Sequence, residues 1–321
     1  MTVADQRDSH PSSPPSDAGE RGDQRAANVA AQAGRWSWRS FTAGFAVAIL
    51  FCGTAAFVIP SPRVETIVLT GVPPADGLEE IQVSSLDEVL GIAADVLDNM
   101  RKSLDDYTAI IVKQETVAGV LTEPTQMAVK VMCTHRGGKA DESEPMRVYL
   151  RFLHPSSVAG REVIWASDRN GGNMVVHEAG ILGLLTLQLD PLGMIAMRGQ
   201  RYPITEIGLT KMVQKLIERG QQDRDNPDVR VTIRRGLELD DMTCDLVTVH
   251  HAKPTGKPDD FSRAEICFDT VRKLPIRYTA YGWSDDEQAP LIESYTYRDI
   301  KTNVGLTEAD FDPKNPDYKF P

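Results

Sequence analysis

The sequence predicts an α+β protein: a curved antiparallel half-barrel sheet of about ten or eleven strands with helices on its concave side, preceded by one transmembrane helix. Three observations predict it. An uncharged apolar run lies near the N-terminus, two stretches have apolar residues at helical spacing, and several stretches alternate apolar with polar residues. Helical spacing gives a helix one apolar stripe, whereas strict alternation gives a strand one apolar and one wet face.

The transmembrane helix is predicted at residues 40–60, because Phe41 to Ile59 contains no charged residue. A helix of that length spans about 28 Å, close to the hydrocarbon thickness of a bilayer. The residues before it include Arg35, Trp36, Trp38 and Arg39, which are typical of a cytoplasmic interface. We therefore expect a single-pass signal-anchor in the cytoplasmic (inner) membrane, with the C-terminal domain on the extracytoplasmic, periplasmic side.

Other interpretations of this apolar run stay open. A cleaved signal peptide would have a similar apolar core, and Gly53-Thr54-Ala55 supplies small residues for a peptidase. A lipid-modified Cys52 would need a small residue before it, and Phe51 is bulky. A buried core helix is disfavoured because the run has no polar stripe.

The remaining chain divides by composition. Residues 1–39 are rich in Ser, Pro, Asp, Gln and Arg and are expected to form a disordered cytoplasmic tail. Residues 61–83 contain Pro62, Pro73 and Pro74 and are expected to form a linker. Residues 84–321 are long enough for one exported domain with a substantial core. The formal net charge of −11 argues against a nucleic-acid partner, because phosphates require a basic surface.

Within the exported domain, Ser84 or Ser85 can cap a helix whose apolar stripe runs from Leu86 to Met100. A second stripe begins at Leu209 and is expected to end at Gly220. Alternation predicts strands around residues 127–133, 148–152, 229–233 and 264–268. The stretches 168–172 and 253–260 have the composition of hairpin connections.

Motifs for chemistry are missing from the sequence. It has no glycine-rich phosphate loop, dinucleotide fingerprint or nucleophile elbow. His250 and His251 would point to opposite faces of a strand, which suits a shared metal badly. We therefore expect no catalytic residue, no metal site and no cofactor, and we expect that the protein is not an enzyme. A hydrolase of unknown type remains a second alternative.

The segment from Ile181 to Met197 is rich in Leu and Met with interspersed glycines. A buried strand and turn would explain it. Alternatively it is a mobile wall that repacks around a flexible apolar ligand, at the mouth of the concave face and beside the second helix. The candidates for a ligand cavity are Trp165, Ile181, Leu185, Leu187, Leu189, Met194, Met197, Tyr278 and Trp283.

Two cysteines could form a disulfide. Cys244 and Cys267 flank the turn at 253–260 almost symmetrically, so a hairpin could bring them together in an oxidising compartment. The alternative is that each cysteine is a small, half-buried apolar residue without a bond.

Several segments resemble a known family. They are Tyr149-Leu-Arg-Phe-Leu-His-Pro155, Gly160-Arg-Glu-Val-Ile164, Leu274-Pro-Ile-Arg-Tyr-Thr-Ala-Tyr281 and the C-terminal stretch from Glu293 to Phe320. They look like an uncharacterised bacterial domain family grouped with LolA, LolB and RseB, the lipoprotein-localisation factor superfamily. The resemblance covers residues 85–320 and implies a LolA-like half-barrel whose cavity holds acyl chains.

Two kinds of function follow from these expectations. The first is a membrane-anchored, non-enzymatic binding protein whose partner is a lipid or acylated protein. The alternative is an RseB-like envelope sensor or interaction module that binds an envelope protein partner.

Overall fold

The computed structural model describes residues 81–321, apart from 139–142, 181–184, 240–241, 257–259 and 285–288. The predicted tail, the transmembrane segment and most of the linker therefore lie outside the described residues. In the part of the chain that is described, no helix is long and apolar enough to cross a bilayer.

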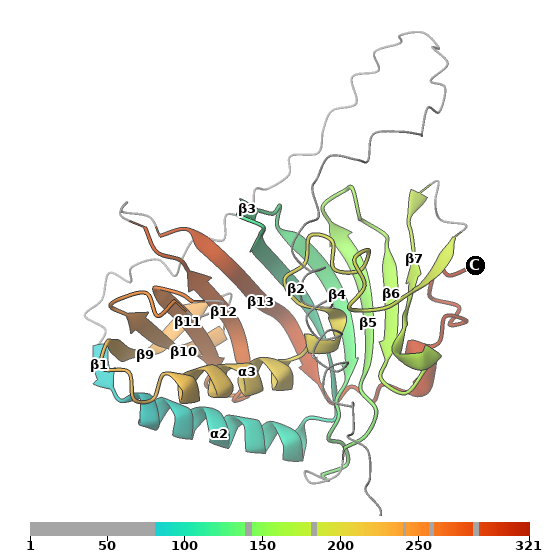
Figure 1. Ribbon diagram of the computed structural model, residues 1–321. Helices are drawn as coiled ribbons and strands as arrows, with labels where there is room; N and C mark the ends of the chain where they lie inside the picture. Colours follow the sequence, from blue (N-terminus) through green and yellow to red (C-terminus); the bar gives the residue numbers. More distant parts are fainter. Residues whose placement is uncertain (1–80, 139–142, 181–184, 240–241, 257–259, 285–288) are drawn as a thin grey trace, which may run out of the picture. The chain divides into compact units, whose positions relative to one another are not determined.

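A single antiparallel sheet of 13 strands forms the body of the domain (Figure 1). Together with two α-helices it gives the α+β class that the sequence predicts. The strands are β1 (Ile81–Ser84), β2 (Asp106–Val117), β3 (Val120–Leu121), β4 (Thr125–Met132), β5 (Arg147–His154), β6 (Glu162–Ala166), β7 (Met174–His177), β8 (Thr186–Leu189), β9 (Val229–Leu239), β10 (Met242–His251), β11 (Arg263–Asp269), β12 (Pro275–Tyr281) and β13 (Leu291–Thr302). The sheet exceeds the expected size because it includes very short strands, β1 and β3, which carry no period-two signal.

The sheet consists of two consecutive series of strands joined in the middle. Its order is β1-β9-β10-β11-β12-β13-β2-β4-β5-β6-β7-β8, with β3 paired to β2 alone. One series runs from β2 to β8 and the other from β9 to β13. The final strand in the sequence, β13, pairs with β2, so the two series meet through a contact between residues far apart in the sequence. The edge strand β1 begins at Ile81, within the segment 61–83 that was expected to be a linker. These residues form a strand because their backbone pairs with that of β9.

Helix α2 (Leu86–Ser103) has the predicted start. Its N-cap is Ser85, whose hydroxyl accepts a hydrogen bond from the Glu88 amide at 3.1 Å. Acidic residues in the first turn and basic residues in the last turn complement the helix dipole. Ala93, Val96 and Met100 form its buried stripe.

Helix α3 (Leu209–Gln222) lies beside α2 on the same face of the sheet (Figure 1). Its N-cap is Gly208, with a φ of 121° that side chains rarely adopt. Gly220 does not end this helix, contrary to the sequence expectation. A Cβ there would lie 2.8 Å from Leu90 Cδ2, so the glycine instead lets α2 and α3 approach closely.

The two predicted connections join paired strands. Residues 168–172 include the short 3₁₀ turn η1 (Asn170–Gly172) between β6 and β7. Residues 253–260 lie between β10 and β11. Two further 3₁₀ turns are η3 (Ile204–Glu206), before α3, and η4 (Glu308–Phe311), after β13.

The C-terminal segment after β13 packs on β4, β5 and β6. Tyr318 stacks on Tyr149 with ring centroids 4.1 Å apart. The Lys319 amide donates a hydrogen bond to Glu162 at 2.7 Å, and Lys130 pairs with Asp310 at 2.7 Å. These contacts cover apolar surface from Tyr149 and Ile164, which is separate from the main core.

The start of this segment is fixed by the buried carboxylate of Asp106, which is 5% exposed. It accepts hydrogen bonds from the amides of Val304 at 2.7 Å and Leu306 at 3.0 Å. Asn303 adds two bonds to the end of α2, because its side chain accepts from the Asp105 amide and donates to the Ser103 carbonyl. The Asp106 carboxylate therefore links the start of β2 to the segment that follows β13.

We expect Asp106→Ala to lower the free energy of unfolding by about 1–3 kcal/mol, because it leaves two amide donors without their acceptor. Urea unfolding followed by circular dichroism measures this. The matched control is Asp98→Ala, which removes only an exposed ion pair with Lys102 and should have little effect. Equal stability of the two variants would contradict the role assigned to Asp106.

Candidate functional site

A large cavity lies between the helices and the sheet. Its volume is about 1190 Å³, and its walls are one face of the sheet, α2, α3 and the segment 189–208. Pockets for small ligands usually measure about 300–1,000 Å³. The space is therefore large enough for a sizeable ligand, and it is the strongest candidate site in the described part of the chain.

The lining near β10 and β11 is apolar. Alternation along these strands directs Val247, Val249 and Ile266 toward the helices, where they meet side chains from α2 and α3. The helix side chains on this side of the cavity are Leu86, Val89, Leu90 and Leu216. We call this part of the cavity the β10–β11 region.

The lining on the other side, near β4 to β8, is also apolar. Its sheet residues are Met127, Leu150, Phe152, Val163, Val176 and Leu189. Opposite them, Ala196, Ile204 and Ile207 contribute from the segment that leads into α3. We call this part of the cavity the β4–β8 region.

Charged residues lie between these regions, where β13 pairs with β2. Glu115 and Glu293 are directly opposite each other in the register, and they are 2% and 5% exposed. Like charges in this position destabilise a sheet. Cations offset them, since Lys113 Nζ lies 3.1 Å from Glu115 and Arg201 Nε lies 3.2 Å from Glu293. The Tyr295 hydroxyl donates to Glu115 at 2.5 Å and reaches Glu293 at 3.2 Å.

The segment before α3 completes this group. Gln200 accepts a hydrogen bond from Lys113. The backbone amide of Arg201 donates to Glu115 at 3.2 Å, and the Tyr202 hydroxyl donates to Glu293 at 3.4 Å. We call the whole set the polar cluster: Lys113, Glu115, Gln200, Arg201, Tyr202, Glu293 and Tyr295.

Burial shifts the pKa of two members of the polar cluster, Glu293 and Tyr295. Desolvation raises the pKa of Glu293, although Arg201 and the Tyr295 hydroxyl act in the opposite direction. Burial also raises the pKa of Tyr295, and the two neighbouring carboxylates raise it further. Tyr295 therefore keeps its proton at neutral pH and remains a hydrogen-bond donor.

A second charged group lies near the C-terminal end of α3. The ring of His251 is buried, with Nε2 3.2 Å from Asp223 and Nδ1 3.6 Å from Asp260. It stacks on Phe261 with centroids 4.4 Å apart, and Arg219 lies 5.4 Å from the centroid of the same Phe261 ring. Backbone amides donating to Asp260 hold its pKa below the usual value, although burial opposes them. Across the described ranges, no cluster of His, Cys, Asp and Glu has the arrangement of a metal site.

Comparison with known proteins places the chain in a family. The model of a protein family of unknown function, DUF1571, matches residues 104–320. The chain belongs to this family. The match confirms the resemblance to an uncharacterised bacterial domain family noted in the sequence. No curated protein matches the chain.

Several solved structures are similar to this DUF1571 protein, each over 71% of its chain. A DUF1329 family protein from Desulfovibrio piger is 13% identical over 98% of its own chain, with a TM-score of 0.35. A domain named as an outer membrane lipoprotein-sorting protein, from Vibrio parahaemolyticus, is 12% identical over 97%, with a TM-score of 0.33. A LolA superfamily protein from Nitrosomonas europaea is 10% identical over 98%, with a TM-score of 0.27. With TM-scores this low, the likeness is remote.

The candidate residues from the sequence have different positions in the DUF1571 domain. Leu189 and Tyr278 line the cavity, whereas Trp165, Met197 and Trp283 are buried or half-buried outside its lining. Trp165 Nε1 donates to the Gly172 carbonyl at 3.1 Å, which fits a packing role. A contribution of Leu189 or Tyr278 to ligand binding remains a prediction, and Ile181 lies outside the described residues.

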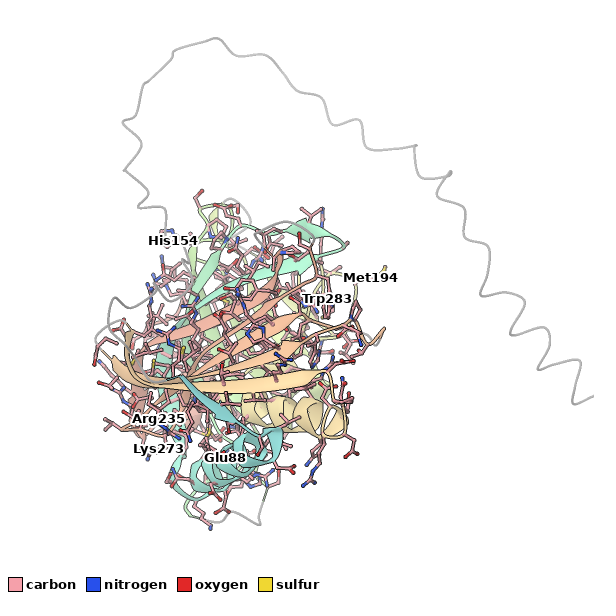
Figure 2. All side chains as sticks on the ribbon, turned by 90° about the vertical axis from the view of Figure 1, so that its left-hand side faces the viewer. Glu88, His154, Met194, Arg235, Lys273 and Trp283 are labelled. Atoms are coloured by element: carbon pink, nitrogen blue, oxygen red, sulfur yellow. The ribbon has the colours of Figure 1, made fainter. Side chains whose placement is uncertain are left out.

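Three other candidates face solvent. Leu185, Leu187 and Met194 are 51%, 39% and 92% exposed, and none of them lines the cavity. Figure 2 shows Met194 projecting from the edge of the domain. Leu187 lies on β8, the edge strand of the sheet, beyond which no further strand lies. Leu185 and Met194 lie in the segments before and after β8. The expectation that this segment borders the cavity therefore applies to residues from Leu189 onward, with Pro191, Ile195 and Ala196 in the lining.

The polar cluster was absent from the sequence-based candidates. Its signal was available, because Lys113 and Glu115 continue the alternation that begins with Ile111, and Glu293 precedes Tyr295 and Tyr297 at the same spacing. Charged residues on an otherwise apolar face of a strand indicate either a solvent-exposed strand end or a functional group. Only the pairing of β2 with β13 shows that they meet.

The three described cysteines are buried free thiols. Cys244 and Cys267 are diagonal neighbours on β10 and β11, because their direct partners are Asp269 and Leu246. A hydrogen bond with Cys244, together with burial, raises the pKa of Cys267. Disulfide formation between them stays a prediction.

Cys133 should be inert in the native protein. Burial raises the pKa of its thiol to about 12. At pH 8 only about one molecule in ten thousand then carries the reactive thiolate. We expect iodoacetamide to leave Cys133 unmodified in native protein and to modify it readily in guanidinium, as measured by peptide mass spectrometry. Rapid native labelling of Cys133 would contradict this environment.

Proposed function

We propose that this protein is a membrane-anchored, extracytoplasmic and non-enzymatic binding protein for a lipid or a lipidated protein. The observation that carries the proposal is the cavity of about 1190 Å³ with apolar lining on two sides. Protein interiors are normally packed without voids of this size. An apolar space that the helices leave unfilled is suited to acyl chains, because burying each methylene group contributes about 0.8 kcal/mol.

Residues 189–208 form one wall of the cavity, and they are the proposed point of entry for a ligand. It contains the short turn η3 but no long helix, so few regular backbone hydrogen bonds fix it. It also contributes both apolar residues and members of the polar cluster to the lining. In the proposed function, the sheet acts as a half-barrel and this segment moves to admit a chain.

The proposed location depends on the apolar run from Phe41 to Ile59, which would hold the domain at the outer face of the cytoplasmic membrane. Tethering places the cavity next to a source of lipids. It also distinguishes this protein from a soluble carrier that diffuses between membranes, so the proposed role is local capture or presentation.

Exposed apolar side chains favour a second candidate function, that of an envelope sensor or interaction module. Leu192, Met194 and Ile195 are 71%, 92% and 73% exposed and nearly consecutive. Clustered apolar exposure is typical of sites that bind other proteins. Since this cluster adjoins the cavity wall, a partner bound there could respond to cavity filling.

Photo-labelling tests the binding function. The full chain is placed in lipid nanodiscs with a sixteen-carbon amphiphile that carries a diazirine near the end of its tail. We expect labelled residues in the β10–β11 region or the β4–β8 region. Leu189→Gln should lower cavity labelling about fivefold or more, because an unpaired polar group in an apolar site costs about 1–3 kcal/mol.

The matched control is Leu121→Gln on β3, whose side chain is 49% exposed and does not line the cavity. Its labelling should equal that of the unmodified chain. Labelling confined to the membrane segment or to the outer surface, with no competition from unlabelled amphiphile, would overturn the proposed function.

Affinity capture tests the second candidate. If a protein partner docks on the exposed segment, Met194→Asp should reduce its recovery about tenfold while cavity labelling stays unchanged. Val271→Asp is the control, because Val271 is 84% exposed in the turn between β11 and β12. Equal recovery with both variants would exclude the segment as the docking site.

A further inference from the structure

The turns that follow β8 expose large apolar side chains. We call residues 190–199, which form consecutive turns, the tip. Within it, Leu192, Met194 and Ile195 are 71%, 92% and 73% exposed. Met194 projects from the edge of the domain (Figure 2). Because transfer of apolar surface from water into an apolar medium is favourable, the tip gains free energy from any apolar surroundings that it can enter.

The backbone of the tip is hydrogen-bonded within itself. The Gly193 amide donates to the Asp190 carbonyl at 2.9 Å, and the Met197 amide donates to the Gly193 carbonyl at 2.9 Å. The Asp190 carboxylate accepts from the Leu192 amide, also at 2.9 Å. Unpaired backbone groups are costly in an apolar medium. These three bonds therefore lower the cost of moving the tip out of water.

The charge of the tip differs from that of the whole chain. Residues 185–200 contain one acidic residue, Asp190, and one basic residue, Arg198. The formal net charge of −11 therefore belongs to the rest of the chain. An acidic surface is repelled by anionic lipids, whereas an exposed arginine pairs well with lipid phosphate. The tip can thus approach a membrane surface without the repulsion that the acidic remainder meets.

The small number of exposed side chains favours a bilayer over a protein surface. A stable protein interface buries about 800 Å² on each partner and uses about 20–30 residues of each. Together with Leu185 and Leu187, which are 51% and 39% exposed, the tip region offers five large apolar side chains. Insertion into a bilayer requires no complementary surface, because each side chain enters the lipid independently.

The tip is continuous with the cavity. Ile195 is 73% exposed and also belongs to the cavity lining, as do Pro191 and Ala196. A lipid tail that leaves a bilayer at the tip would therefore meet apolar side chains from the membrane surface to the interior of the cavity. This continuity connects the exposed patch to the proposed binding function.

We propose that the tip inserts into the surface of a lipid bilayer, and that the cavity takes up its ligand from that bilayer past Ile195. This inference rests on the proposed binding function, and it adds the surface from which the ligand comes. The predicted anchor makes the encounter frequent, because residues 60–80 would span at most about 70 Å when fully extended. A tethered tip therefore stays close to the membrane surface.

The first test places a fluorescent dye on the tip. Met194→Cys is made in the full chain with Cys52→Ser, and the three described cysteines are buried. An environment-sensitive thiol dye is attached, and the protein is placed in nanodiscs that contain a phospholipid with a nitroxide near the start of its tail. We expect about threefold or stronger quenching of the dye at position 194, because inserted side chains lie about 5–10 Å deep.

The control for this measurement is Val271→Cys. Val271 is 84% exposed in the turn between β11 and β12, but Arg272 and Lys273 follow it directly. A dye at this position should remain in water, and the nitroxide should scarcely quench it. Thermal unfolding establishes that each variant is folded.

The second test follows the rate of uptake. A sixteen-carbon amphiphile with a diazirine near the end of its tail is added to the nanodiscs, and samples are illuminated at intervals. Met194→Asp should slow the rise of cavity labelling about tenfold without changing its final level, because an aspartate resists entry into a bilayer. Val271→Asp should leave the rate unchanged. An eight-carbon amphiphile that dissolves in water should label all three proteins at equal rates.

The outcomes separate the two proposals. If the nitroxide quenches position 194 no more than position 271, bilayer insertion is overturned, and a protein partner whose recovery depends on Met194 would then be the occupant of the tip. If position 194 is quenched but Met194→Asp does not slow labelling, or slows both amphiphiles equally, uptake past Ile195 is overturned. If the tip is quenched and no amphiphile labels the cavity, the binding function fails while the contact with the bilayer stands.

Discussion

The pairing of β2 with β13 is the contact on which the rest of the structure depends. It joins the two series of strands into one sheet, and it does so between residues separated by most of the domain sequence. Asp106 and Asn303 reinforce it at one end by tying the chain after β13 to the start of β2. Because each series alone would expose a long unpaired edge, this contact converts two smaller sheets into one continuous face.

The same pairing carries an electrostatic cost. Its register places Glu115 opposite Glu293 on the buried face, and burial together with the charge of Glu115 raises the pKa of Glu293. The compensation comes from a distant segment, since Arg201 contributes a guanidinium to one carboxylate and a backbone amide to the other. The wall of the cavity is therefore held to the sheet through charged contacts, and the apolar lining on either side is left for other occupants.

Helix packing explains why the cavity exists. α2 and α3 pack tightly against each other at Gly220 and Leu90, and they cover the sheet near β9 and β12. Their buried stripes cover only part of that face of the sheet, and residues of β4 to β8 line the space that they leave. The exposed residues around Met194 lie at the end of this uncovered portion, where the sheet has its last strand.

The sequence by itself determined the α+β class, the start of both helices and the existence of alternating strands, because these depend on local periodicity and capping at residues such as Ser85. It also named Leu189 and Tyr278 as candidates for a ligand cavity; both are in the lining of the cavity, and their part in binding stays a prediction. Only the tertiary structure decided that Lys113, Glu115 and Glu293 form one group, that Gly220 is a helix contact, and that Leu187 and Met194 face solvent. These features depend on which strands become neighbours, and a local pattern carries no information about a pairing between β2 and β13.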